Sequence, residues 1–123
     1  MSKILYVEDN FENRLFVRRV LESMGYQIIE AEDGVTGIEI AKSEKPDLIL
    51  MDVGLPGIDG LETTVRIKKI PELKNIPIVA LTANAMKGDA ERCLAAGCDG
   101  YLTKPIGVVA LREQVLKYVK TTS

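Results

Sequence analysis

Five short runs of apolar and β-branched residues alternate along the chain with longer segments that mix apolar and polar positions. The runs cover residues 4–7, 27–31, 48–51, 78–81 and 101–103. Each run has the length and the composition of a strand that is buried in a sheet. The pattern therefore predicts five strands, with the run LILM at residues 48–51 as the most apolar of them.

The segments between the runs carry apolar residues three and four positions apart, which is the period of an amphipathic helix. This spacing occurs at residues 15–24, 38–41, 61–67 and 109–120. Gly25 and Gly97 stand where helix ends are expected, and Asp9, Asn10 and Asp59 stand at expected helix starts. The sequence thus indicates strands and helices in alternation.

Five strand-helix units in one chain predict a parallel sheet with helices on both faces. The usual arrangement is a flavodoxin-like, doubly wound (βα)5 fold with the strand order 2-1-3-4-5, in which the first and third strands are neighbours. Ligands of such sheets bind beyond the carboxyl ends of the strands, where the winding reverses. At 123 residues the chain has the size of one domain, which we expect to span residues 1–123.

Composition narrows the classes of protein that the chain can represent. A net charge of −2 argues against a polybasic surface for nucleic acid or membranes, and no apolar run has the length of a membrane span. Cys93 and Cys98 are accompanied by no histidine, so a zinc site is excluded. We interpret them as reduced thiols of a cytoplasmic protein rather than as a disulfide.

Acidic residues follow two of the predicted strands that should be neighbours. Glu8 and Asp9 come after the first strand, and Asp52 comes after the third. We expect Asp52 to stand at the mouth of its strand and outside the buried part. Like charges that are held close together destabilise one another, and a hard cation such as Mg²⁺ commonly offsets this cost. The acids, with a backbone carbonyl from residues 53–55, predict a magnesium site.

The ends of the last two strands carry groups that suit a phosphoryl ligand. The fourth strand ends at Thr82, whose hydroxyl can bond a phosphoryl oxygen, and the fifth leads into Lys104. Pro105 follows, and a cis bond before it would fix the turn that aims the lysine. Because the chain has no histidine and carboxylates can form aspartyl phosphates, the central Asp52 is the expected acceptor.

Four motifs in this order resemble one family, the receiver domain of two-component response regulators. They are VEDN, LILMDVGLPGIDG, VALTANAM and YLTKPI, and together they span nearly the whole chain. The fragments LTANAMKGD and AAGCDGYLTKP are similar to single-domain regulators of the cell-division type and to the receivers of hybrid histidine kinases.

The resemblance implies a set of roles for the residues at the strand ends. Asp52 would accept a phosphoryl group from a phosphohistidine of a histidine kinase or a histidine phosphotransfer protein. Asp9, Asp52 and the carbonyl of Gly54 would bind Mg²⁺, with help from Glu8 through water. Lys104 would contact a phosphoryl oxygen. The protein would assist its own phosphorylation and dephosphorylation and would not be an enzyme with a separate substrate.

The resemblance also implies a switch. Thr82 would move towards the phosphoryl group and Tyr101 would rotate inward behind it, which would alter the surface that a downstream protein reads. Gly54 and Asn84 occupy positions that tune the lifetime of the phosphoryl group in the family. Since only the segment KTTS follows Val119, we expect no output domain, no direct contact with nucleic acid, and a monomer or weak dimer that acts by protein contacts.

Two other hypotheses about the function are less favoured by the sequence. Gly54, Gly57 and Gly60 follow a strand as in nucleotide-binding loops, but their spacing is G-x-x-G-x-x-G and not G-x-G-x-x-G. This argues against an enzyme that binds a nucleotide or a flavin. A receiver that works by binding alone would be expected to lack the acceptor, an acid or the lysine, and all of them are present.

Overall fold

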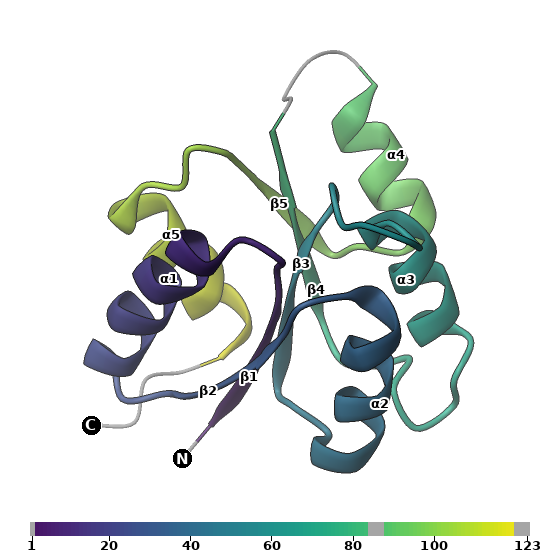
Figure 1. Cartoon of the computed structure of the whole chain (residues 1–123), viewed down its shortest axis with the longest axis horizontal. Helices are drawn as coiled ribbons and strands as arrows, with labels where there is room; N and C mark the ends of the chain where they lie inside the picture. Colours follow the sequence, from purple (N-terminus) through teal and green to yellow (C-terminus); the bar gives the residue numbers. More distant parts are fainter. Residues whose placement is uncertain (1, 84–87, 120–123) are drawn as a thin grey trace.

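The computed structural model describes residues 2–83 and 88–119 and contains one five-stranded parallel sheet (Figure 1). The strands are β1 (Lys3–Val7), β2 (Gln27–Ala31), β3 (Leu48–Asp52), β4 (Ile78–Thr82) and β5 (Gly100–Thr103). The helices are α1 (Phe11–Ser23), α2 (Gly34–Glu44), α3 (Gly60–Lys68), α4 (Asp89–Ala96) and α5 (Val108–Tyr118). Strand and helix alternate along the chain as the sequence predicts.

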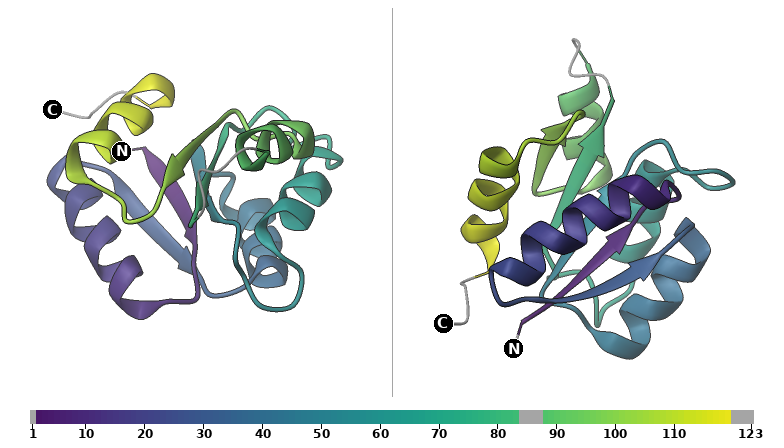
Figure 2. Two further views of the ribbon diagram at one scale, coloured as in Figure 1. Left: turned by 90° about the horizontal axis from the view of Figure 1, so that it is seen from above. Right: turned by 60° about the vertical axis from the view of Figure 1, so that its left-hand side comes forward.

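The strands lie in the order β2-β1-β3-β4-β5, which confirms the predicted flavodoxin-like fold. All four neighbouring pairs are parallel. Helices α1 and α5 cover one face of the sheet, and α2, α3 and α4 cover the other (Figures 1 and 2). The order places β1 beside β3, so the segments that follow these two strands meet at one edge of the sheet.

The core is divided by the sheet because successive side chains of a strand point to opposite faces. Tyr6 and Leu50 pack in the cluster that includes residues of α1 and α5. Leu5 and Met51 pack in the cluster on the face of α2, α3 and α4. Every residue of β3 and β4 is buried, as expected for the central strands of a doubly wound sheet.

Side chains cap the helices that begin near the carboxyl edge of the sheet. Asn10 and Asp59 each accept a hydrogen bond from a backbone N–H three residues later, which confirms two of the predicted helix starts. Asp33 does the same for α2. Asp9 lies one residue before the cap of α1, so it is not the capping residue. Gly97 ends α4 with a φ of 110°, a conformation that favours glycine.

The two cysteines lie close to the end of α4 and are both buried and free. Burial raises the pKa of the Cys98 thiol to about 11, so the protonated form is favoured at neutral pH. Both cysteines belong to the core cluster on the face of the sheet that α2, α3 and α4 cover. Among the described residues, no helix combines the length and the hydropathy required to span a bilayer.

Candidate functional site

The carboxyl ends of β1, β3, β4 and β5 border a hollow of about 470 Å³. Its lining includes all of the predicted acceptor, metal and phosphoryl-binding residues: Glu8, Asp9, Asp52, Gly54, Thr82 and Lys104. Asn84, which was expected to tune the phosphoryl lifetime, lies outside the described residues. We call this hollow the acidic crevice.

Asp52 is the last residue of β3, and its position differs from the expected one. It pairs with Leu81 of β4 and is 4% exposed, so the expectation that it stands outside the buried part of the strand was wrong. Its Oδ1 accepts hydrogen bonds from the backbone N–H of Gly54, at 3.2 Å, and from Lys104 Nζ, at 2.8 Å. The carboxylate is therefore buried next to a cation that lies 52 residues further along the chain.

Lys104 supplies the positive charge of the crevice. The turn after β5 contains a cis peptide bond between Lys104 and Pro105. Nζ lies 2.8 Å from Asp52 Oδ1 and 3.2 Å from Glu8 Oε1. Burial alone would lower the pKa of Lys104, but the hydrogen bond and charge of Asp52, together with Glu8, outweigh it and raise the pKa. Lys104 thus stays protonated between two carboxylates.

Glu8 is the most enclosed of the acids, at 1% exposure. Its Oε1 accepts hydrogen bonds from the Tyr6 hydroxyl, at 3.0 Å, and from Asn13 Nδ2, at 3.4 Å. Its Oε2 accepts one from the backbone N–H of Asn10, at 3.2 Å. These donors hold the carboxylate in one orientation.

The ionised form of Glu8 is unfavourable in spite of these hydrogen bonds. Burial raises its pKa, and so do the hydrogen bond and the negative charge of Asp52, while Lys104 and the Asn10 N–H act in the opposite direction. Two buried carboxylates thus share one ammonium group. A further cation in the crevice would relieve the remaining repulsion.

The geometry of the acids fits a hard divalent cation. Glu8, Asp9 and Asp52 each offer an oxygen, and these oxygens all lie within 4.8 Å of one another. Asp9 is exposed, whereas both oxygens of Glu8 already accept hydrogen bonds. Asp9 and Asp52 are therefore the better placed direct ligands for Mg²⁺, which keeps several waters and needs few carboxylates. Gly54 lines the same crevice, and a role for its carbonyl stays a prediction.

Three residues of this site were not predicted from the sequence. Tyr6 and Asn13 bond Glu8, and Asp89 of α4 lines the crevice and accepts a hydrogen bond from Thr82 Oγ1 at 2.9 Å. Tyr6 could have been found, because residues two apart on a strand share a face. No sequence pattern predicts Asp89 as a site residue, because its position depends on the residue at which α4 begins.

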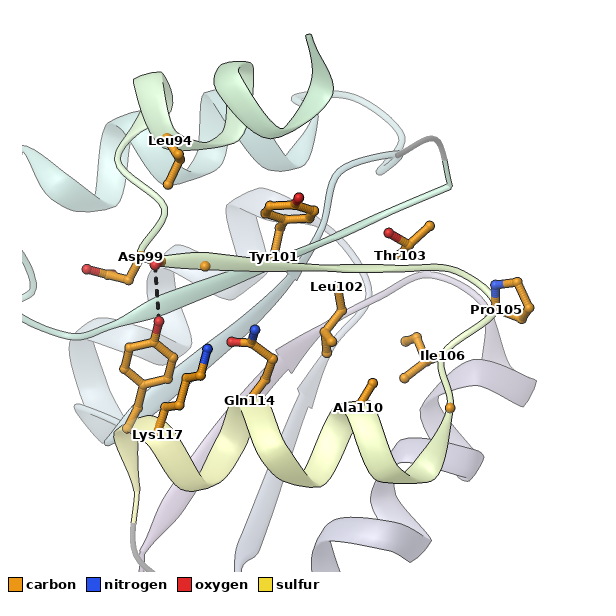
Figure 3. A pocket seen from close by; sticks show the side chains of 13 residues that line it. Leu94, Asp99, Tyr101, Leu102, Thr103, Pro105, Ile106, Ala110, Gln114 and Lys117 are labelled. Atoms are coloured by element: carbon orange, nitrogen blue, oxygen red, sulfur yellow. Dashed lines mark hydrogen bonds between the residues drawn. The ribbon is translucent and has the colours of Figure 1, made fainter. Parts of the chain in front are cut away.

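Tyr101 is separate from the acidic crevice. It is 38% exposed on β5 and lines a second hollow of about 580 Å³ between α4, β5 and α5. Figure 3 shows its ring on the α4 side of β5, like Leu94, whereas Leu102 points towards α5. The Tyr118 hydroxyl closes one end of this hollow by donating to the carbonyl of Asp99. The inward rotation expected of Tyr101 stays a prediction.

Replacing Asp52 with Asn is expected to raise the free energy of unfolding of the metal-free protein by about 1 kcal/mol. The change removes one of two buried like charges and leaves Lys104 paired with Glu8. Thermal melting should show the gain, and Mg²⁺ should reduce it by stabilising the wild type more. Glu39→Gln, an exposed change on α2, is the control. A metal-free Asp52→Asn protein that melts below the wild type would contradict the repulsion.

Comparisons with known proteins identify the relatives of this chain. A family model described as response regulator receiver domain matches residues 4–116. The polar-differentiation response regulator DivK of Brucella anthropi is 42% identical over 118 residues, which cover 96% of each chain.

Solved structures are similar over almost the whole chain. The receiver domain of the sensor histidine kinase PA1611 from Pseudomonas aeruginosa has a magnesium ion coordinated in its active site cleft. It is 38% identical with a TM-score of 0.88, over 95% of this chain and 96% of that one. The chemotaxis response regulator CheY4 of Vibrio cholerae is 28% identical with a TM-score of 0.91, over 97% and 99% of the two chains.

Proposed function

The chain belongs to the response regulator receiver domain family of two-component signalling, and from this premise we propose that Asp52 accepts a phosphoryl group from a phosphohistidine of a partner protein. The observation that carries the proposal is the buried carboxylate of Asp52, 2.8 Å from Lys104 Nζ at the carboxyl edge of the sheet. A histidine kinase or a histidine phosphotransfer protein is the proposed donor.

The transfer is a displacement at phosphorus. An Asp52 carboxylate oxygen forms the new O–P bond while the P–N bond to the donor imidazole breaks, and the imidazole nitrogen leaves with the bonding electron pair. The approaching group brings negative charge into a crevice that is already lined by the carboxylates of Glu8, Asp9, Asp52 and Asp89. Lys104 Nζ lies where it can contact a phosphoryl oxygen on Asp52, so it offsets part of this charge.

The proposed cofactor is Mg²⁺, held by Asp9 and Asp52 with the carbonyl of Gly54 and with Glu8 through water. When bound, it supplies positive charge to the oxygens of the transferring phosphoryl group. The protein's own part is to fix the carboxylates. Tyr6, Asn10 and Asn13 orient Glu8, and the Gly54 N–H orients Asp52. The magnesium ion in the cleft of the Pseudomonas receiver domain supports this choice of metal.

We propose that the receiver domain signals by contacts with a downstream protein in the cytoplasm, as a monomer or weak dimer without direct binding to nucleic acid. The Brucella relative, which is matched over 96% of each chain and is named a response regulator, supports a signalling role for the receiver domain. Thr82 and Tyr101 would carry the change, the first in the acidic crevice and the second on the α4 side of β5. The protein would assist its own phosphorylation without turning over a separate substrate.

Intact mass after incubation with phosphoramidate and Mg²⁺ tests the proposal directly. The wild type should gain one phosphoryl group as the P–N bond of phosphoramidate breaks and ammonia leaves. Asp52→Asn and a metal-free sample should gain none, whereas Glu39→Gln, an exposed change on α2, should behave like the wild type. An adduct of equal amount on Asp52→Asn, or none on the wild type, would overturn the proposal.

A further inference from the structure

The hydroxyl of Thr82 is engaged at the end of β4. Its Oγ1 donates to Asp89 Oδ2 at 2.9 Å, and Thr82 itself is only 2% exposed. Asp89 is the first residue of α4, so the bond joins the carboxyl end of a central strand to the first turn of a helix. Both residues line the acidic crevice together with Asp52.

The two oxygens of Asp89 face different partners. Oδ2 accepts from Thr82 on the inside, and Oδ1 lies 3.4 Å from the guanidinium Nη1 of Arg92 on the outside. The side chain of Asp89 is 21% exposed and that of Arg92 is 63% exposed. Asp89 therefore links the hydroxyl in the crevice to the exposed surface of α4.

A phosphoryl group on Asp52 would compete for the same hydroxyl. A threonine hydroxyl has one hydrogen to donate, so a strong bond to a phosphoryl oxygen requires the bond to Asp89 to be given up. Asp89 also carries a negative charge that opposes a second anion in the same crevice. Both effects of Asp89 act against the phosphorylated form.

We propose that Asp89 is a positioning residue that holds the Thr82 hydroxyl in the unphosphorylated protein and thereby limits how readily the crevice accepts a phosphoryl group. The inference rests on the proposed function, because it takes Asp52 as the acceptor. When Thr82 turns to the phosphoryl group, Asp89 keeps its place in the first turn of α4 and loses its inner partner. The hydrogen bonding of the first turn of α4 then differs between the two forms.

Beryllium trifluoride, which binds a carboxylate as a phosphoryl analogue, tests the competition in the presence of Mg²⁺. Fluorine NMR measures the concentration of the analogue at which half of the protein is occupied. Asp89→Ala removes the acceptor and should bind the analogue about fivefold more tightly than the wild type. Glu91→Ala removes the other acid of the same helical turn, which is exposed, and should match the wild type.

Asp89→Asn separates the hydrogen bond from the charge. Its side-chain oxygen can still accept from Thr82, so its affinity for the analogue should stay closer to that of the wild type than to that of Asp89→Ala. If Asp89→Asn binds as tightly as Asp89→Ala, charge alone is responsible and the proposed hold on the hydroxyl is wrong. If Asp89→Ala binds like the wild type, the proposal fails as a whole.

A second measurement needs no phosphoryl group and separates this inference from the proposed function. Urea unfolding of Thr82→Val, Asp89→Ala and the double variant should be non-additive by about fivefold in the unfolding equilibrium constant. Thr82→Val combined with Glu91→Ala should be additive. Additivity for the first pair would overturn the inference. Coupling in that pair together with no analogue binding and no phosphoryl adduct on the wild type would instead overturn the proposed acceptor.

Discussion

Lys104→Met is expected to lower the free energy of unfolding of the metal-free protein by about 3 kcal/mol. The Lys104 ammonium lies 2.8 Å from Asp52 and 3.2 Å from Glu8, whose side chains are 5% and 1% exposed. Methionine retains most of the volume of the side chain but none of its charge, so both buried carboxylates lose their cation. Removing one partner of a buried pair costs more than the pair itself contributes.

Urea unfolding at neutral pH, with and without Mg²⁺, measures this loss. Because Mg²⁺ would then be the main source of positive charge in the crevice, it should stabilise Lys104→Met more than it stabilises the wild type. Lys42→Met, an exposed change on α2, should leave the stability nearly unchanged. Equal unfolding free energies for Lys104→Met and the wild type without metal would show that Lys104 does not offset the charge of the acids.

The expected opposite effects of Lys104→Met and Asp52→Asn have one origin. In the metal-free protein the acidic crevice holds two buried carboxylates for one ammonium group, and the raised pKa of Glu8 reflects its burial and its proximity to Asp52. Removing a negative charge improves this balance, whereas removing the positive charge worsens it. The arrangement leaves an excess of negative charge in the crevice at some cost in stability, which is what the proposed Mg²⁺ site would offset.

The placement of the main site residues could be predicted because of a simple property of parallel sheets. The strands are apolar enough to be recognised, and all of them end at the same edge. Residues that follow different strands, such as Glu8, Asp52 and Lys104, are therefore brought together although they are far apart in the sequence. The burial of Asp52 was not predicted, because a charged residue after an apolar run suggests the end of a strand, and its distant cation shows no local pattern.

Other features depend on contacts that a linear pattern does not record. Helix α4 has eight residues and one buried residue, Cys93, so its apolar period is too short to fix where it starts. The contact between Asp89 and Thr82 depends on that start. Likewise, the distances of Nζ of Lys104 to two carboxylates depend on the turn at Pro105, which the sequence indicates without giving its geometry.

Gly60→Ala is expected to destabilise the protein by about 3 kcal/mol and to slow the proposed phosphorylation of Asp52. Gly60 begins α3 and donates its N–H to the carbonyl of Val53 at 3.0 Å. A Cβ added there would lie 2.1 Å from the carbonyl oxygen of Asp52, so the start of α3 or the end of β3 must shift. Alanine favours a helix over glycine by about 1 kcal/mol, which is too little to compensate.

Two measurements separate the effect of Gly60→Ala on the site from its effect on the fold. Urea unfolding gives the loss of stability, and the rate of adduct formation with phosphoramidate, measured at a temperature where the variant is fully folded, reports the displaced acceptor. Gly107→Ala is the matched control, because nothing lies within 4 Å of the added Cβ and its cost should stay below about 1 kcal/mol. A Gly60→Ala protein as stable and as reactive as Gly107→Ala would mean that the loop between β3 and α3 can move away from Asp52. The close approach of α3 would then have no part in holding the acceptor in place.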